Sequence, residues 1–193
     1  MLKFAIICRY DTLIKDMKNS QETPQNWAFH GVLRRLKSMI KVLFVCHGNI
    51  CRSTMAEMVF KDLVRKEYLS DLFYINSAAT SREEIGNGVH YGTRRKLAQV
   101  GIFCEDHRAV QMTKRDYETY DYLIGMDSNN MRNMQRIIGG DPKNKMYKLL
   151  DFSERKGQNI ADPWYTGNFD ATYNDVKEGC EGLLKHIMDK MES

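Results

Sequence analysis

Cys46 and Arg52 are the residues whose types and spacing most clearly predict chemistry in this sequence. They bracket a glycine-bearing stretch that directly follows a short apolar run and reads Cys46-His47-Gly48-Asn49-Ile50-Cys51-Arg52-Ser53-Thr54. Between a buried strand and a helix, the backbone N–H groups of such a loop can curl around a tetrahedral oxyanion. The planar guanidinium of Arg52 can hold two oxygens of the same anion. The stretch therefore predicts an anion-binding loop.

Cys46 is predicted to be the nucleophile of this site. Its thiol would lie beneath the bound anion, at the N-terminus of a helix and close to Arg52. Both neighbours favour the thiolate form of a cysteine, and the thiolate is the form that attacks phosphorus. Cys51 is expected to be a small buried thiol in the same loop. Because the two cysteines share a tight loop, we expect Cys46 to be redox-sensitive and to form a disulfide with Cys51.

A second chemical element follows later in the chain, at Asp162-Pro163-Trp164-Tyr165. Attack on a phosphate ester requires a proton donor for the leaving oxygen, and a carboxylic acid in a partly apolar loop can supply that proton. Pro163 should hold Asp162 in an extended conformation. Trp164 and Tyr165 could wall a cleft that fits an aromatic ring. Taken alone, the segment also fits an ordinary Asp-Pro turn with two packed aromatic side chains.

Composition restricts the other possibilities. The formal net charge of +4 is carried by residues 1–38, and residues 39–193 are neutral, so the body of the chain gives no support for a nucleic-acid partner. No apolar run approaches the length of a membrane span. The five cysteines are irregularly spaced and form neither a disulfide framework nor a zinc motif. We therefore expect a cytoplasmic protein that needs no metal and no cofactor.

The order of elements predicts an α/β fold with a four-stranded parallel sheet, helices on both faces, and a phosphate-binding loop after the first strand. The four strands are expected at residues 40–45, 72–76, 122–126 and 146–150. Their carboxyl ends should gather Cys46, Ser77, Asp127 and the loop after Leu150 at one edge.

Two helix starts are predicted from short polar signals. Thr54 and Glu57 have the spacing of a capping box for the helix that follows the anion-binding loop. Ser128 is expected to cap the helix that follows the third strand. Asp127 reads as a strand-end residue or a partner of that helix, and it is left out of the predicted catalytic set.

Residues 1–38 read differently from the rest of the chain, with a short apolar run, a polar stretch and a small basic patch. They form either a disordered N-terminal extension or the product of a start-site artefact. Because Met39 directly precedes the first strand, we favour the artefact. Residues 39–193 are expected to form the single folded domain.

The anion-binding loop and the Asp162 segment together resemble the low-molecular-weight protein tyrosine phosphatases, and bacterial members in particular. The resemblance covers nearly all of residues 39–193. It implies a protein-tyrosine phosphatase that hydrolyses phosphotyrosine through a cysteinyl-phosphate intermediate, with Cys46 as nucleophile, Arg52 as phosphoryl ligand, and Asp162 as acid and then base. It also implies phosphotyrosine-bearing proteins or peptides as substrates and inorganic phosphate as product and inhibitor, with neither nucleic acid nor membrane as a partner.

The remaining site residues are assigned as follows. Substrate binding is predicted for His47, Gly48, Asn49, Ile50, Cys51, Trp164 and Tyr165, while the resemblance assigns support of the loop and the thiolate to Ser53, Ser77 and His107. Each supporting residue also has a plainer interpretation, as a helix cap, a loop-shaping residue or a surface histidine.

The chain departs from the better-known animal members of this family at two places. The stretch Ser81-Arg82-Glu83-Glu84 stands where those enzymes have a pocket-lining tryptophan, and Val110 replaces an arginine. Both changes bear on substrate preference. The alternatives are a protein-arginine phosphatase, which Ile50 disfavours because that branch has threonine there, an arsenate reductase, and a phosphoryl carrier or phosphopeptide-binding module. Asp162 argues against a carrier, and the thiol argues against a binding module.

Overall fold

The computed structural model describes residues 39–104 and 106–192. The predicted N-terminal extension, residues 1–38, lies outside the described residues. The described chain contains a four-stranded parallel sheet with the order β2-β1-β3-β4. Its strands are β1 (Ile40–Cys46), β2 (Phe73–Ala79), β3 (Tyr122–Gly125) and β4 (Met146–Lys148). This sheet is the predicted one.

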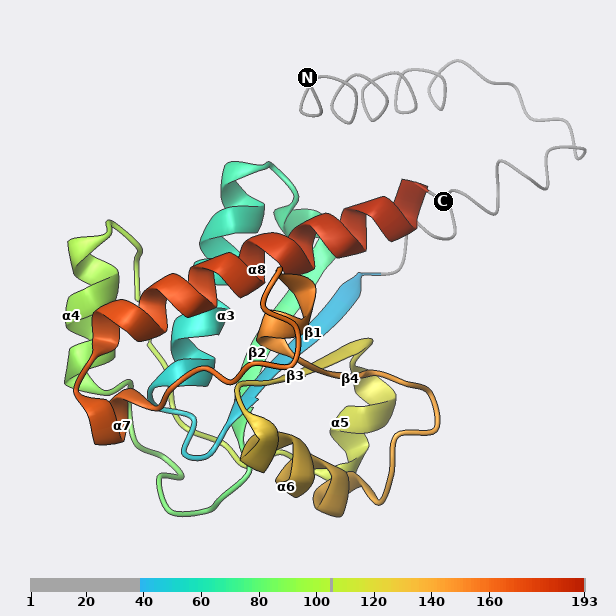
Figure 1. The fold of residues 1–193 in the computed structure, drawn as a ribbon, viewed down its shortest axis with the longest axis horizontal. Coiled ribbons are helices and arrows are strands. Elements are labelled where there is room, and N and C mark those ends of the chain that lie inside the picture. The colour runs from blue at the N-terminus through green and yellow to red at the C-terminus, as the bar shows by residue number, and fades with distance from the viewer. Residues whose placement is uncertain (1–38, 105, 193) are drawn as a thin grey trace, which may run out of the picture. The chain divides into compact units, whose positions relative to one another are not determined.

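Helices connect the strands and cover both faces of the sheet (Figure 1). They are α3 (Arg52–Lys66), α4 (Tyr91–Gln99), α5 (Lys114–Thr119), α6 (Ser128–Ile138), α7 (Pro163–Thr166) and α8 (Phe169–Glu192), with single 3-10 turns at Ser70–Leu72 and Leu149–Phe152. None of the described helices is both long and apolar enough to span a membrane.

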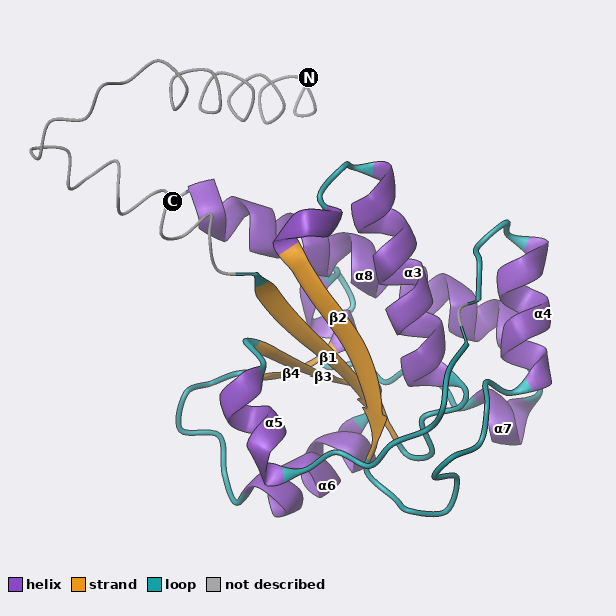
Figure 2. Cartoon of the chain, turned by 180° about the vertical axis from the view of Figure 1, so that it is seen from behind, coloured by secondary structure: helices purple, strands orange, loops and turns teal. Residues whose placement is uncertain are grey.

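Strand β1 lies at the centre of the fold because both of its faces are buried. Val42 and Phe44 point into a core shared with α3 and α8. Leu43 and Val45 point into a second core shared with α5 and α6, on the other face (Figure 2). A strand that is covered on both faces reads as a continuous apolar run, which is why the sequence identified β1 so clearly.

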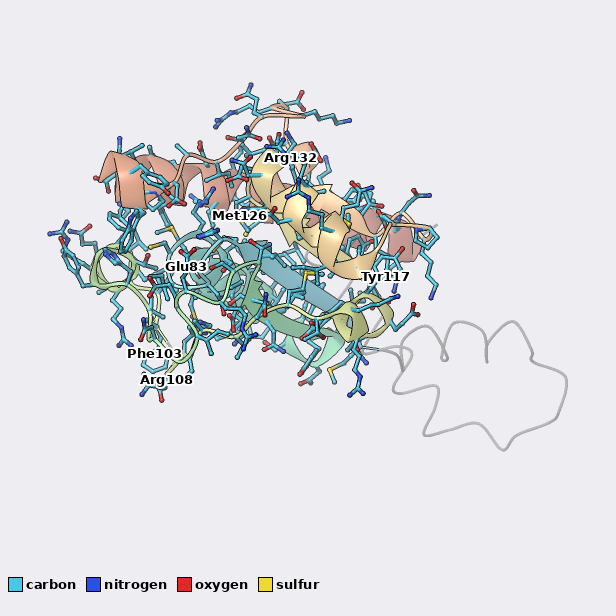
Figure 3. All side chains as sticks on the ribbon, turned by 90° about the horizontal axis from the view of Figure 1, so that it is seen from below. Glu83, Phe103, Arg108, Tyr117, Met126 and Arg132 are labelled. Carbon is cyan, nitrogen blue, oxygen red and sulfur yellow. The ribbon has the colours of Figure 1, made fainter. Side chains whose placement is uncertain are left out.

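The carboxyl end of β1 is the point where the direction of strand addition reverses, since β1 pairs with β2 on one side and with β3 on the other. Crevices for ligands form at such points in open α/β sheets. The loop after β1, Asp127 after β3 and Asp162 before α7 all lie at this edge. Figure 3 views the molecule from this side, with Met126, the residue that follows β3, labelled.

Both predicted helix starts are wrong. Helix α3 begins at Arg52, and the Thr54 hydroxyl donates 2.8 Å to the Cys51 carbonyl instead of forming a capping box with Glu57. Asp127, and not Ser128, caps α6, because its Oδ1 accepts from the Asn130 N–H at 2.7 Å. In both cases a short polar pattern was compatible with more than one starting residue, and tertiary contacts chose between them.

Candidate active site

The loop between β1 and α3 wraps around the thiol of Cys46. The backbone N–H of Asn49 donates to Cys46 Sγ at 3.3 Å, and Ser53 Oγ lies 3.1 Å from the same sulfur. Cys51 occupies the N-cap position of α3 but gives no side-chain cap. The first N–H groups of α3 therefore have no side-chain partner from that residue and can bind an anion above Cys46.

Asn49 fixes the shape of this loop. Its backbone is in the left-handed region, with φ 58°, which asparagine tolerates better than most residues. Its side-chain amide donates to Ser53 Oγ at 3.0 Å and to Ser77 Oγ at 2.8 Å, and its Oδ1 accepts from the Val110 N–H at 3.1 Å. Between Ser53 Oγ and Cys46 Sγ either atom can donate, and the hydroxyl is the donor when Cys46 is a thiolate. Asn49 thus links the thiol to β2 and to the segment after α4.

Two supporting residues of the prediction, Ser77 and His107, join the same network. The Ser77 hydroxyl donates to Glu57 Oε2 at 2.5 Å. The ring nitrogen Nε2 of His107 lies 2.9 Å from the Asn49 carbonyl oxygen, so Nε2 is the nitrogen that carries the proton. Its other nitrogen lies 3.9 Å from Glu57 Oε2. The network therefore runs from β2 to the loop through side chains that are remote in sequence.

Glu57 is a functional residue that the sequence reasoning missed. It is buried on α3, where its Oε1 pairs with Lys61 at 2.8 Å while its Oε2 accepts from Ser77. The available signal was an acidic residue among the apolar residues Ala56, Val59 and Phe60 on the buried face of a helix. The sequence pattern instead assigned Glu57 to a capping box.

A cavity of about 380 Å³ borders this network. Glu57, Ser77 and His107 line part of it, whereas Cys46, Arg52 and Asp162 do not. The cavity therefore lies beside the side chains that support the loop and is separate from the anion site itself.

Arg52 connects the loop to two carboxylates. It is 3% exposed, and its Nη1 donates to Asp127 Oδ2 at 2.5 Å and to the Ile160 carbonyl at 3.1 Å. Its Nη2 donates to Asp162 Oδ2 at 2.5 Å. Burial alone would lower the pKa of Arg52, but the negative charges of Cys46, Asp162 and Asp127 outweigh it and raise that pKa. Arg52 is therefore a permanent cation beside the thiol.

Asp162, the predicted acid, directly precedes α7. Its backbone is extended, Pro163 is the first residue of α7, and its Oδ1 accepts from the Trp164 N–H at 3.1 Å. The other carboxylate oxygen contacts Arg52. An anion that binds Arg52 competes for this contact and would free that carboxylate oxygen.

The apolar residues predicted to bind the substrate have different positions. Trp164 and Tyr165 are 58% and 84% exposed, and Trp164 makes an edge contact with the His90 ring, whose centroid is 5.7 Å away. Ile50 is buried against Ala109, with Phe169 packed nearby. The aromatic side chains are thus free to meet a ligand, while Ile50 mainly anchors the loop.

The other predicted loop residues differ in character. Burial, together with the charges of Cys46 and Asp162, raises the pKa of Cys51 to about 12, so Cys51 is a neutral thiol near neutral pH. His47 is exposed at the rim, with Nε2 3.0 Å from Glu83 Oε2. Gly48 lies under the side chain of Glu84, since a Cβ built on it would be 3.0 Å from Glu84 Cγ.

All the predicted site residues lie at one edge of the sheet or belong to the side chains that support the loop there. Asp127, which the prediction left out of the catalytic set, joins them through Arg52. Over residues 39–104 and 106–192, no group of three or more His, Cys, Asp or Glu side chains is arranged to hold a metal ion. The arrangement suits a thiolate attack on a bound tetrahedral anion, with the Asp162 carboxyl group on the same arginine.

Comparisons with known proteins agree with this chemistry. The family model described as "Low molecular weight phosphotyrosine protein phosphatase" matches residues 41–193. The chain is 39% identical over 155 residues to the low molecular weight protein-tyrosine-phosphatase YfkJ of Bacillus subtilis, which covers 80% of this chain and 99% of that protein. It is also 39% identical to the low molecular weight phosphotyrosine protein phosphatase of Mus musculus, covering 75% of this chain and 93% of that protein.

Solved structures give the same result. The crystal structure of YfkJ superposes with a TM-score of 0.77 at 40% identity, covering 79% of this chain and 97% of that chain. The low molecular weight protein tyrosine phosphatase SP-PTP from Streptococcus pyogenes superposes with a TM-score of 0.69 at 42% identity, covering 77% of this chain and 93% of that chain.

Proposed function

Because the chain belongs to the low molecular weight phosphotyrosine protein phosphatase family, we propose that Cys46, Arg52 and Asp162 carry out its reaction. The protein is a protein-tyrosine phosphatase, a cysteine-dependent enzyme that hydrolyses phosphoric monoesters. The loop N–H groups and Arg52 bind the phosphoryl group of a phosphotyrosine above the Cys46 thiolate.

In the first step a bond forms between Cys46 Sγ and phosphorus while the bond from phosphorus to the tyrosine oxygen breaks. Asp162 gives its proton to that oxygen, so tyrosine leaves as a neutral phenol. In the second step Asp162 removes a proton from water, the water oxygen attacks phosphorus, and the sulfur–phosphorus bond breaks. Inorganic phosphate and the Cys46 thiolate are the products, and phosphate is expected to be a competitive inhibitor.

The observation that carries this assignment is the double contact of Arg52. The guanidinium lies beside Cys46 in the loop and also contacts Asp162, 110 residues away. A phosphoryl group that binds Arg52 therefore lies between the nucleophile and the acid. When its oxygens replace Asp162 on the guanidinium, the released carboxylate takes up a proton from water and then gives it to the leaving oxygen.

Cys46→Ser tests this assignment directly. The variant keeps the loop backbone and Arg52, so it should still bind phosphate or vanadate with an affinity close to that of the parent. It should lose turnover of an aryl phosphate, because serine lacks a stabilised anion at neutral pH. Turnover near that of the parent would refute the covalent role of Cys46.

Phosphotyrosine fits the depth of the site. Cys46 is buried at the bottom of the loop, and a phosphoserine side chain is too short to bring its phosphorus down to the sulfur. A planar phenyl ring can pass the exposed Trp164 and Tyr165. We place the protein in the cytoplasm, because a reactive thiolate requires a reducing compartment.

A panel of matched peptides tests the choice of phosphorylated residue. Phosphotyrosine should be hydrolysed fastest, phosphoarginine weakly, and phosphoserine and phosphothreonine hardly at all. The guanidine of phosphoarginine would leave donors unpaired at the small exposed part of Ile50, which is apolar, at a cost of about 1–3 kcal/mol. Ile50→Thr should therefore move the ratio towards phosphoarginine. If the parent preferred phosphoarginine over phosphotyrosine, the substrate assignment would be wrong and the catalytic roles would remain.

A further inference from the structure

We propose that Glu83 and Glu84, here called the acidic rim, make this phosphatase prefer phosphotyrosines that are flanked by basic residues. The proposal rests on the function proposed above for Cys46. It assigns a substrate-selecting role to two residues outside the catalytic set. The argument depends on where the two carboxylates lie, how firmly they are held, and which charges surround them.

The acidic rim lies directly on the loop that binds the phosphoryl group. Glu83 Oε2 is 3.0 Å from Nε2 of His47, the residue that follows Cys46, and the two side chains are 71% and 49% exposed. Glu84 passes over Gly48 and accepts from the Asn87 side chain at 2.7 Å. Glu83 also lies on the side of the molecule at which the strands end (Figure 3).

Backbone hydrogen bonds hold the rim segment, residues 80–87, at both ends. On one side, Thr80 N–H donates to the Cys46 carbonyl at 2.8 Å and Ser81 N–H to the His47 carbonyl at 3.0 Å. On the other side, Gly86 N–H donates to the Ala109 carbonyl at 2.9 Å, and Ala109 N–H donates to the Asn87 carbonyl at 2.8 Å. The backbone that carries the two glutamates is therefore held beside the phosphoryl site.

Neither carboxylate of the rim forms an ion pair with an arginine or lysine of the described residues. In the described part of the chain, Glu84 is bound by a neutral amide and Glu83 by a histidine. Arg82, the adjacent cation, makes no hydrogen bond or ion pair with either carboxylate among the described residues. At the anion site itself, by contrast, Arg52 balances the charge of the ligand.

A peptide whose phosphotyrosine lies above Cys46 must bring its neighbouring residues past this rim. A lysine or arginine there would be attracted, and a glutamate would be repelled, at distances over which exposed charges still interact. Because each contact is exposed, the preference should be modest and should weaken as salt increases.

The experiment compares peptides that carry the same phosphotyrosine flanked by lysine, alanine or glutamate, using the parent and the double variant Glu83→Gln/Glu84→Gln. For the parent we expect kcat/KM to be about 3- to 10-fold higher for the lysine peptide than for the glutamate peptide at low salt. In 0.5 M salt, about three times physiological ionic strength, the ratio should fall towards one. In the double variant it should be close to one at any salt concentration.

Glu118→Gln is the matched control. Glu118 is similarly exposed, at 69%, and also accepts one contact, from Lys143 at 2.6 Å. It lies on α5, which precedes β3 and so lies towards the amino ends of the strands. This variant should keep the preference of the parent, and Arg82→Gln should increase it.

The results separate this proposal from the function on which it rests. If the alanine peptide is not hydrolysed, the assigned function fails. If all three peptides are hydrolysed at similar rates, the function stands and the acidic rim has no selective role. A lysine preference that persists in the double variant would also overturn the proposal, because another surface would then produce it.

Discussion

Asp127 holds Arg52 by an ion pair between Oδ2 of the carboxylate and Nη1 of the guanidinium, 2.5 Å apart, although the two residues are 75 positions apart in the chain. The other carboxylate oxygen caps α6 through the Asn130 N–H. One side chain thus orients the phosphoryl-binding cation and also starts a helix. Since Arg52 is buried, its orientation is set by such contacts rather than by water.

Asp127→Asn should separate these two roles. Asparagine is as good a helix cap as aspartate, so the start of α6 should be preserved, and any fall in melting temperature should come from the lost ion pair with the buried Arg52. The charge-assisted bond to Arg52 is lost, and bonds to charged groups contribute about 1.5–3 kcal/mol, so kcat/KM for an aryl phosphate should fall by about 10- to 100-fold. Asp127→Ala should show the same loss of activity together with a lower melting temperature. Unchanged kcat/KM in Asp127→Asn would exclude a positioning role.

Asp162→Asn should slow the steps that require proton transfer by roughly 10²- to 10⁴-fold. The amide oxygen can still accept from the Trp164 N–H, so the start of α7 should be preserved. The loss should be smaller for aryl phosphates whose leaving group is a weak base, because such groups depart without a proton. Steady-state rates over a series of leaving groups measure this, and equal losses across the series would remove Asp162 from the acid role.

Ser77→Ala should lower the stability of the fold and the activity together. The variant leaves the buried carboxylate of Glu57 without its hydroxyl donor and leaves the amide of Asn49 with Ser53 Oγ as its remaining acceptor. We expect the free energy of unfolding to fall by about 1–3 kcal/mol, measured by urea denaturation. Thr80→Val is the control, because the Thr80 hydroxyl is buried without a hydrogen-bond partner in the described structure. A similar loss in both variants would mean that packing, and not the network, is responsible.

Peroxide should inactivate the enzyme reversibly through Cys46 and Cys51. Oxidation of Cys46 to the sulfenic acid removes its negative charge, which is one cause of the raised pKa of Cys51. The Cys51 sulfur can then displace water to form the disulfide. A thiol reductant should restore activity, and mass mapping should identify the Cys46–Cys51 bond. Recovery of Cys51→Ser as complete as that of the parent would contradict a protective disulfide.

At pH 7 an alkylating reagent should distinguish the thiols of Cys46 and Cys51 in the reduced enzyme. A group whose pKa lies well above the ambient pH keeps its proton, and the pKa of Cys51 is about 12. Iodoacetamide should therefore modify Cys46 and leave Cys51 unmodified in the native protein, and bound phosphate should protect Cys46. Cys51 should become reactive only as the pH is raised towards its pKa.

The sequence by itself determined the parts of this protein that depend on short spacings. The apolar run of β1 and the loop from Cys46 to Arg52 are consecutive, so their residue types indicated a thiol beneath an anion site. The Asp162-Pro163 pair likewise predicted an extended acid before a short turn, which α7 confirms. Local backbone preferences and the period of a buried strand are sufficient for such predictions.

Only the tertiary structure decided which distant side chains complete the site. The pairing of β1 with β3 brings Asp127 to Arg52, and the pairing of β1 with β2 brings Ser77 to Asn49 and Glu57. The contact of His47 with Glu83 likewise depends on how the segment after β2 returns to the loop. These contacts depend on the order of the strands and on the rotation of each helix about its axis. The same local elements are compatible with several such arrangements. Glu57 and Ser128 therefore read as helix-start signals, while the packed molecule uses Glu57 as a buried hydrogen-bond acceptor and Asp127 as the cap.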